Sequence, residues 1–179
     1  MPNDQDNLFL YEALELRAEY QARIASLKKL LPEKQKSPGR GFLRNAEDER
    51  REPVADFDPA AVRETIRKLE YKARKLNNAI QQVNFVQKLS VGGEEMSIAE
   101  ALELRKSVSN DLASLQKMVE QAAYRRVIYK EERNIVEEPD SRFADIAREL
   151  EERRLLFRRI NRALRKASFE VTVAFKDED

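Results

Sequence analysis

Mostly apolar residues recur at alternating intervals of three and four along four segments of the sequence, and charged residues fill most positions between them. Side chains with this spacing fall on one narrow stripe of an α-helix, as they do in coiled coils. The pattern therefore predicts four amphipathic helices. The stripes of the first and third segments are Leu10, Ala13, Arg17, Tyr20, Ile24, Leu27, Leu31 and Ile98, Ala101, Arg105, Val108, Leu112, Leu115, Val119. Those of the second and fourth are Val62, Ile66, Leu69, Ala73, Leu76, Ile80, Val83 and Ile146, Leu150, Arg153, Phe157, Ile160, Leu164, Ala167.

A stripe this narrow has to be buried against another helix. Each Leu, Ile or Phe side chain removed from water contributes roughly 1.5 to 3 kcal/mol. Four such helices can cover one another's stripes at crossing angles of ~20°. We therefore expect an all-α fold, an antiparallel four-helix bundle, formed as a single domain over residues 1–179.

An internal repeat supports this architecture. The sequence EALELR occurs at Glu12–Arg17 and again at Glu100–Arg105, and the surrounding residues match at the same shift of 88 residues, while a later pair of segments matches at a shift of 84. Helices rich in Leu, Glu, Lys and Arg resemble one another by composition alone, but composition does not reproduce the order of the matched segments. The order favours a duplicated helical hairpin. The predicted boundaries are residues 8–91 for the first repeat, with a charged loop at 32–58, and 97–175 for the second.

Breakers and caps mark the helix ends. Asp58-Pro59 offers an N-cap and a proline at the first position of the second helix, and Ser97 followed by Glu100 forms a capping box for the third. Pro139-Asp140-Ser141 is expected to open the fourth helix in the same way. Gly92-Gly93 predicts a turn between the two halves.

The C-terminal tail has a different period. Residues 169–175 alternate between apolar and polar positions and are rich in β-branched and aromatic side chains, which predicts a short β-strand. Its partner is expected at residues 127–129 or 85–91, or in another subunit.

Composition narrows the classes of function. Lys and Arg total 34 against 33 Asp and Glu, so the whole chain lacks the positive field that would draw it onto nucleic acid or anionic lipid. Cysteine and histidine are both absent, which excludes disulfides, zinc fingers, His-based triads and His-containing di-iron sites. We expect no metal, no cofactor and no enzymatic activity.

The amino terminus, MPNDQDNLFL, lacks the basic start and apolar core of a secretory signal. No stretch approaches the ~20 uncharged apolar residues that a membrane span needs. We expect a cytoplasmic protein without a membrane span.

Two arginines fall on the predicted stripes, where a charge is costly unless it is paired and hydrogen-bonded. In each antiparallel hairpin, amides of the neighbouring helix lie at the same level. The hypothesis is a structural polar layer composed of Arg17, Arg105, Asn77, Asn84 and Asn161. Two alternatives stay open: the arginine stems flank the seam while their heads reach solvent, or the two arginines hold a ligand carboxylate or phosphate.

The fourth helix is basic over residues 153–166, which contain seven Lys or Arg residues and no Asp or Glu. A basic amphipathic helix can bind phosphates or lie on an anionic surface. The alternative, which we favour, is a solvated face that pairs with acidic side chains of nearby helices. The candidate anion-binding residues are Arg154, Arg158, Arg162, Arg165 and Lys166.

Three segments resemble a known family: LYEALELRAEYQARIASLKKLL near the start, RKLNNAIQQVNF followed by a turn and SIAEALELR in the middle, and RRINRALRKASFEV near the end. In this order, from about Leu8 to Val171, they resemble a family of uncharacterised bacterial proteins, some of which are called septicolysin. The resemblance implies a bacterial helical bundle and brings no established activity or catalytic residue. Where the family has Asn-x-Thr-Asn near the end of the second helix, this chain has Asn77-Asn78 and Asn84.

These patterns together favour a non-enzymatic interaction or structural protein that forms a homo-oligomer, expected to be a homodimer, through a helix face or the C-terminal strand. Binding of nucleic acid or an anionic surface through the fourth helix is the alternative. A septicolysin-like toxin is a remote one, because the sequence lacks an export signal and a cysteine for thiol activation.

Overall fold

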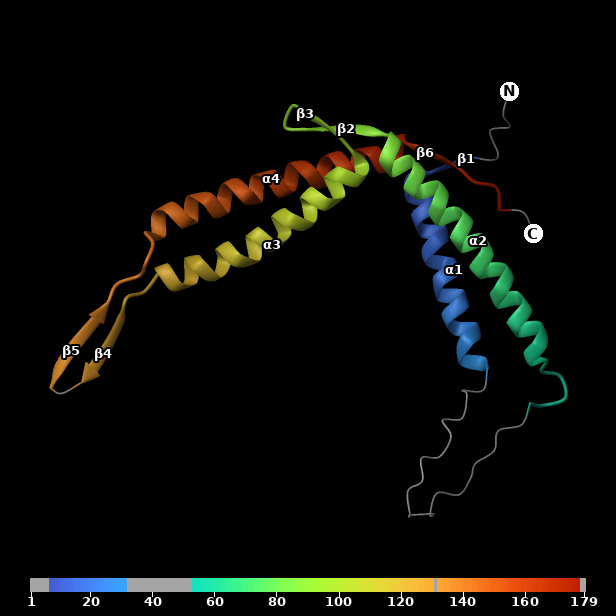
Figure 1. Cartoon of the computed structure of the whole chain (residues 1–179), viewed down its shortest axis with the longest axis horizontal. Helices are drawn as coiled ribbons and strands as arrows, with labels where there is room; N and C mark the ends of the chain where they lie inside the picture. The colour runs from blue at the N-terminus through green and yellow to red at the C-terminus, as the bar shows by residue number, and fades with distance from the viewer. Residues whose placement is uncertain (1–6, 32–52, 131, 178–179) are drawn as a thin grey trace, which may run out of the picture. The chain divides into compact units, whose positions relative to one another are not determined.

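The computed structural model describes residues 7–31, 53–130 and 132–177. Four helices account for most of these residues, so the predicted mainly helical character is confirmed (Figure 1). Three two-stranded antiparallel sheets accompany the helices, where the sequence predicted one C-terminal strand. The helices are α1 (Leu10–Leu30), α2 (Pro59–Val86), α3 (Ile98–Ala122) and α4 (Phe143–Glu170). The strands are β1 (Asn7–Phe9), β2 (Lys88–Val91), β3 (Glu94–Ser97), β4 (Arg126–Lys130), β5 (Arg133–Glu137) and β6 (Thr172–Ala174). No helix within these ranges is long and apolar enough to cross a bilayer.

The chain divides into two compact units. The first comprises the described residues up to Ile80 together with those from Val173 onward, and the second comprises the described residues of Gln81–Thr172. In the first unit α1 and α2 run antiparallel, since Arg17 contacts Asn77 while Lys28, further along α1, pairs with the earlier Glu70 at 2.6 Å.

In the second unit α3 and α4 pack antiparallel along two apolar clusters. Val108 and Ile160 form one cluster with Val91 of the β2–β3 hairpin, and Leu115 packs with Ile146 and Leu150 in the other. Ile160 is 0% exposed and Val108 is 1% exposed, so these contacts exclude water completely. The hairpin therefore covers the end of the helix pair near Val108.

The predicted stripes coincide with the buried side of each helix. Every stripe position is buried or half-buried except Arg105, which is exposed. A period of 3.5 to 3.6 residues places these side chains above one another, so the burial follows from the sequence spacing. The stripe prediction is confirmed at the level of residue burial.

Two predicted helix starts are confirmed and one is wrong. Asp58 Oδ1 accepts the backbone N–H of Ala60 at 2.7 Å, and Ser97 forms the expected capping box with Glu100. The fourth helix begins at Phe143 with Arg142 as its N-cap, so Pro139-Asp140-Ser141 lies before the helix and does not open it.

The Gly92-Gly93 turn is confirmed and closes a β-hairpin. Gly92 and Gly93 have φ angles of 64° and 97°, in the left-handed region that glycine enters without steric cost. β2 and β3 pair antiparallel on either side, with Val91 opposite Glu94. The segment between the halves is thus a hairpin rather than a bare turn.

The C-terminal strand exists but is shorter than predicted. α4 continues through Phe169 to Glu170, so only Thr172–Ala174 is extended. Its partner is β1, so the predicted partners at residues 127–129 and 85–91 are wrong. Residues 127–129 pair within β4–β5, while residues 85–91 contain the end of α2 and β2, which pairs with β3. Residues 32–52 of the predicted charged loop lie outside the described residues, while residues 53–56 are exposed.

The order of elements is the same in both halves apart from one insertion. β1-α1-α2-β2 is followed by β3-α3-α4-β6, with the β4–β5 hairpin inserted between α3 and α4. β2, which follows α1 and α2, pairs with β3, which precedes α3 and α4. In the same way β6, which follows α4, pairs with β1, which precedes α1. At the start of α1, Glu12 Oε2 accepts the N–H of Phe9 at 2.7 Å, as Glu100 Oε2 accepts that of Ser97 at 2.7 Å before α3.

Candidate functional site

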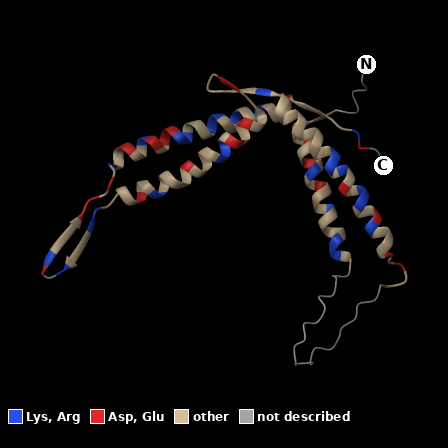
Figure 2. Ribbon diagram, viewed as in Figure 1, with Lys and Arg blue, Asp and Glu red and all other residues tan. Residues whose placement is uncertain are grey.

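The basic face of α4 is the strongest concentration of like charge among the described helices. Acidic side chains occupy the N-terminal half of α4 up to Glu152, and the next acidic residue is Glu170 (Figure 2). Between them Arg158, Arg162 and Arg165 follow one another at intervals of four and three, so they lie along one side of the helix. All three are exposed.

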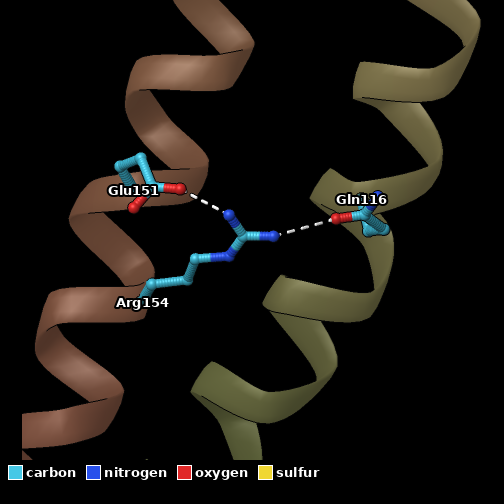
Figure 3. Close-up of polar contacts among 3 residues, drawn as sticks. All are labelled: Gln116, Glu151 and Arg154. Atoms are coloured by element: carbon cyan, nitrogen blue, oxygen red, sulfur yellow. Dashed lines mark hydrogen bonds and ion pairs between the residues drawn. The ribbon is translucent and has the colours of Figure 1, made fainter.

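Three basic residues in the C-terminal half of α4 pair with described residues, in addition to Arg148 near its start. Arg154 pairs with Glu151 one turn earlier and donates from Nη2 to Gln116 Oε1 of α3 at 3.2 Å (Figure 3). Arg153 lies 3.9 Å from Asp111, and Lys166 lies 3.7 Å from Glu170. Arg154 of the candidate anion-binding set is therefore occupied in joining α3 to α4.

The other arginines of this face have no carboxylate partner among the described residues. Within residues 7–31, 53–130 and 132–177, no carboxylate lies within 4.0 Å of Arg158, Arg159, Arg162 or Arg165. We call these four residues the open arginine stripe. Arg159 is not one of the predicted anion-binding residues, but the structure places it at a pocket.

This pocket lies between the β2–β3 hairpin and α4. It has a volume of about 470 Å³ and is lined by Ser90, Val91, Gly92, Arg159, Arg162, Ala163 and Lys166. Three cations come from α4, and Gly92 carries no side chain, so a ligand can approach the backbone of the turn. Guanidinium groups and an ammonium group at an apolar floor can bind a phosphate or carboxylate.

The predicted polar layer is present at one point. Arg17 Nη1 donates to Asn77 Oδ1 at 3.3 Å and joins α1 to α2. Within the part of the chain that the structure describes, Arg105, Asn84 and Asn161 make no side-chain hydrogen bond to another member of the set. Asn84 is buried at 7% exposure, Asn161 is half-buried and Arg105 is exposed.

A polar cluster in the first unit was not anticipated. Lys72 Nζ of α2 donates to Asp177 Oδ1 at 3.0 Å, and the Tyr20 hydroxyl of α1 lies beside the same carboxylate, at a geometry outside the range of an ordinary hydrogen bond. The pKa of Asp177 is lowered, chiefly by the Tyr20 hydroxyl and then by Lys72. Burial, followed by Asp177, raises the pKa of Tyr20. These contacts hold the C-terminal segment against both helices.

A larger groove of about 990 Å³ opens beside the start of α4, where acidic and basic side chains alternate. Arg142, Arg148 and Arg153 line it together with Asp145, Glu149 and Glu152. Arg148 and Asp145 pair at 3.4 Å, so part of the charge is neutralised internally. No group of three or more acidic residues with metal-ligand spacing occurs among the residues that the structure places.

No protein-family model and no curated protein matches the chain. A crystal structure of a functionally unknown conserved protein from Corynebacterium diphtheriae is similar, with a TM-score of 0.66 and 18% identity, over 93% of this chain and 99% of that chain. The similarity covers nearly the full length of both proteins and shows a shared helical fold.

Proposed function

We propose that the chain is a non-enzymatic interaction protein that forms homo-oligomers, with a homodimer as the basic assembly. The observation that carries the proposal is the β4–β5 hairpin, which extends beyond the ends of α3 and α4 (Figure 1). Val127, Tyr129, Ile135 and Val136 are 53%, 72%, 39% and 46% exposed on it. A two-stranded sheet this small is marginal in water, and exposed apolar side chains at unpaired sheet edges are typical of contact surfaces.

The proposed architecture is a four-helix bundle of two repeated hairpins. The shared order of strand, helix, helix and strand supports the repeat, as does the equal role of Glu12 and Glu100 at the starts of α1 and α3. Each unit alone contains one helix pair, which buries one stripe per helix. Association of further helices, within the chain or between copies, would cover additional apolar surface.

Light scattering of the purified full chain over a concentration series tests the oligomer. The expected result is a rise in molar mass from 20.9 kDa towards twice that value. A constant mass of 20.9 kDa at every concentration, together with no protein partner recovered by cross-linking in a bacterial lysate, contradicts the proposal.

The second candidate function is binding of nucleic acid or another polyanion through α4. It is favoured by the open arginine stripe and by the adjoining pocket with Arg159, Arg162 and Lys166. Each phosphate contact contributes about 0.9 to the slope of log affinity against log salt for duplex DNA. Fluorescence anisotropy with labelled DNA, between low and physiological salt, measures that slope.

A matched pair of variants separates this candidate from general charge effects. Arg158→Gln, Arg162→Gln and Arg165→Gln combined should reduce DNA affinity about 10-fold or more at low salt and flatten the salt slope. The control removes three exposed arginines from α2, as Arg63→Gln, Arg67→Gln and Arg74→Gln. Equal losses in both variants, or no binding by the unchanged protein, exclude a specific role of α4.

Kinship with the septicolysin-named bacterial family and a cytoplasmic location are also part of the proposal, and they rest on the sequence patterns. A toxin that lyses membranes is the remote alternative. Release of a trapped dye from anionic vesicles by the pure protein would support the toxin and contradict the interaction role.

A further inference from the structure

The outer edge of β5 has a self-complementary sequence. β5 reads Arg133-Asn134-Ile135-Val136-Glu137, all five residues are exposed, and its only strand partner among the described residues is β4. We infer that β5 pairs antiparallel with β5 of a second copy of this chain, centred on Ile135. This inference rests on the proposed homo-oligomer and assigns its interface.

Charge favours this register. When two copies of β5 run antiparallel about Ile135, Arg133 of each copy lies opposite Glu137 of the other. Opposite charges at directly facing positions stabilise a sheet, and like charges destabilise it. The pairing therefore contributes two favourable cross-strand contacts, one at each end.

In the isolated hairpin, Arg133 has a like charge opposite it. Its register sets Arg133 opposite Lys130, two like charges, whereas Glu137 already pairs with Arg126 at 3.5 Å. A second copy would bring a carboxylate to Arg133 without removing the Arg126 contact. The cost of the like-charge pair is then offset in the dimer.

The apolar side chains also align. Ile128 lies opposite Ile135 in the hairpin, so both point to the same face. In the proposed four-stranded sheet, the two copies would place Ile128, Ile135, Ile135 and Ile128 in one continuous row across that face. A row of β-branched side chains is a favourable arrangement for neighbouring strands.

The other edge of the hairpin does not suit self-association. Two β4 strands paired antiparallel about Ile128 would set Arg126 opposite Lys130 at both ends, which repel. Pairing of β4 with β5 of another copy would leave an open edge on each side and propagate into a chain rather than close as a dimer. β5 with β5 is the closed, two-fold arrangement that the charges favour.

A strand contact of five residues is small beside a standard interface. We therefore expect a dimer that dissociates on dilution and weakens as salt rises, because the two ion pairs are exposed. The apparent dissociation constant should increase by at least ~3-fold between low and high salt.

Disulfide trapping tests the register directly, since the chain has no cysteine of its own. Facing residues of an antiparallel pair have Cα atoms ~4.5 to 5.5 Å apart, within the range that a disulfide spans. Ile135→Cys, oxidised by dissolved oxygen with copper phenanthroline, should give a covalent dimer in high yield. Tyr129→Cys, on the strand remote from the interface, is the matched control and should remain largely monomeric on a non-reducing gel.

Charge reversal supplies the second test. Arg133→Glu and Glu137→Arg should each abolish the dimer, because each brings like charges together at both ends. Mixing the two variants restores both opposite pairs, so an equimolar mixture should form a heterodimer. Lys117→Glu, an exposed change of the same size on α3, should leave the dimer intact. Far-UV circular dichroism checks that all variants keep their helices.

The outcomes separate this inference from the proposed function. If the unchanged protein dimerises but neither reversal affects it and Ile135→Cys does not cross-link, the β5 interface is wrong while the homo-oligomer stands. If the unchanged protein is monomeric at all concentrations, both are wrong. Loss in each single variant with recovery in the mixture supports both.

Discussion

The outer faces of α2 and α4 differ far more than their buried seams do. At the shift of 84 residues, Leu76 of α2 corresponds to Ile160 of α4, and both are 0% exposed. On the outer face, however, Arg162, Arg165 and Lys166 of α4 correspond to Asn78, Gln81 and Gln82 of α2. The packing of two helices depends on the apolar side chains between them and does not require a particular charge on their outer faces. The basic face is therefore a property of the second half that its fold does not require.

The ends of the two hairpins differ as well. α3 and α4 are joined through β4 and β5, on which every apolar side chain except that of Ile128 is exposed. The first half has no described strand at the corresponding place. Conversely, only the first unit receives the C-terminal segment, through Tyr20, Lys72 and Asp177. Features outside the buried helix interfaces are the places to look for function.

The largest expected effect comes from the buried apolar side chains between the two helices of each pair. Ile160→Asp places a carboxylate where no water reaches, and the loss of the apolar side chain alone costs about 4 kcal/mol. Leu76→Asp should destabilise the first unit by a similar amount. Thermal unfolding followed at 222 nm measures both. Leu155→Asp on α4, where the residue is 46% exposed, is the control and should change stability by less than about 0.5 kcal/mol. An unchanged melting point for Ile160→Asp would contradict the burial of Ile160 between α3 and α4.

The capping box of α3 should have the next largest effect. Ser97 Oγ accepts the N–H of Glu100 at 3.1 Å. The N-cap of α1 is Phe9, whose side chain cannot accept such a hydrogen bond. Ser97→Ala should cost about 1 kcal/mol in urea unfolding. Ser107→Ala, an exposed change within the same helix, serves as the control. Equal stability of the two variants would contradict the cap.

The same box gives a pH dependence. Hydrogen bonds from the Ser97 backbone and then its hydroxyl lower the pKa of Glu100 below the ordinary 4.5. The unfolded chain therefore binds this proton more readily than the folded chain does, so the stabilisation is present above pH 4.5 and is lost as pH falls. Unfolding at a series of acidic pH values should show a shallower decline in Ser97→Ala than in the unchanged protein. Parallel declines would disprove the assignment.

A smaller effect is expected at the C-terminal contact that only the first unit has. Asp177→Asn removes a partly exposed ion pair with Lys72 and should cost about 0.5 kcal/mol.

The Tyr20 hydroxyl beside the same carboxylate gives a pH dependence at alkaline pH. Because the pKa of Tyr20 is raised above its usual 10.0, the folded chain keeps the hydroxyl proton at pH values where the unfolded chain loses it. This ionisation should leave the stability of the unchanged protein unaffected below pH 10 and lower it above pH 10. Tyr20→Phe should remove that alkaline loss of stability. Tyrosinate absorbance at alkaline pH monitors the same ionisation.

The smallest effect is expected at the arginines of the repeated EALELR segment. The Arg17 contact with Asn77 is long at 3.3 Å and Asn77 is exposed, so Arg17→Leu should cost less than about 0.5 kcal/mol. Arg105→Leu, at the equivalent but exposed position, should cost nothing measurable. A loss of several kcal/mol for either would indicate the full polar layer and a closer likeness between the two halves.

Much of the local structure was predictable because it depends on neighbours along the chain. The helical stripes, the caps at Asp58 and Ser97, and the Gly92-Gly93 turn all follow from residues within four positions of one another. The β4–β5 hairpin escaped notice because its turn lacks the usual Asn-Gly or Gly-Gly signal. Glu132 takes a φ of 63° there, which is uncommon for a residue other than glycine.

The sequence by itself determined which side of each helix is buried and where most helices begin, because the helical period fixes the neighbours of every side chain. Only the tertiary structure decided which partners meet: β6 with β1, Asp177 with Lys72 and Tyr20, Arg154 with Gln116. It also decided that Arg158, Arg162 and Arg165 have no carboxylate nearby among the described residues. Identical arginines on one helix differ in this way because an ion pair depends on a distance across helices, and the order of residues along the chain does not encode that distance locally.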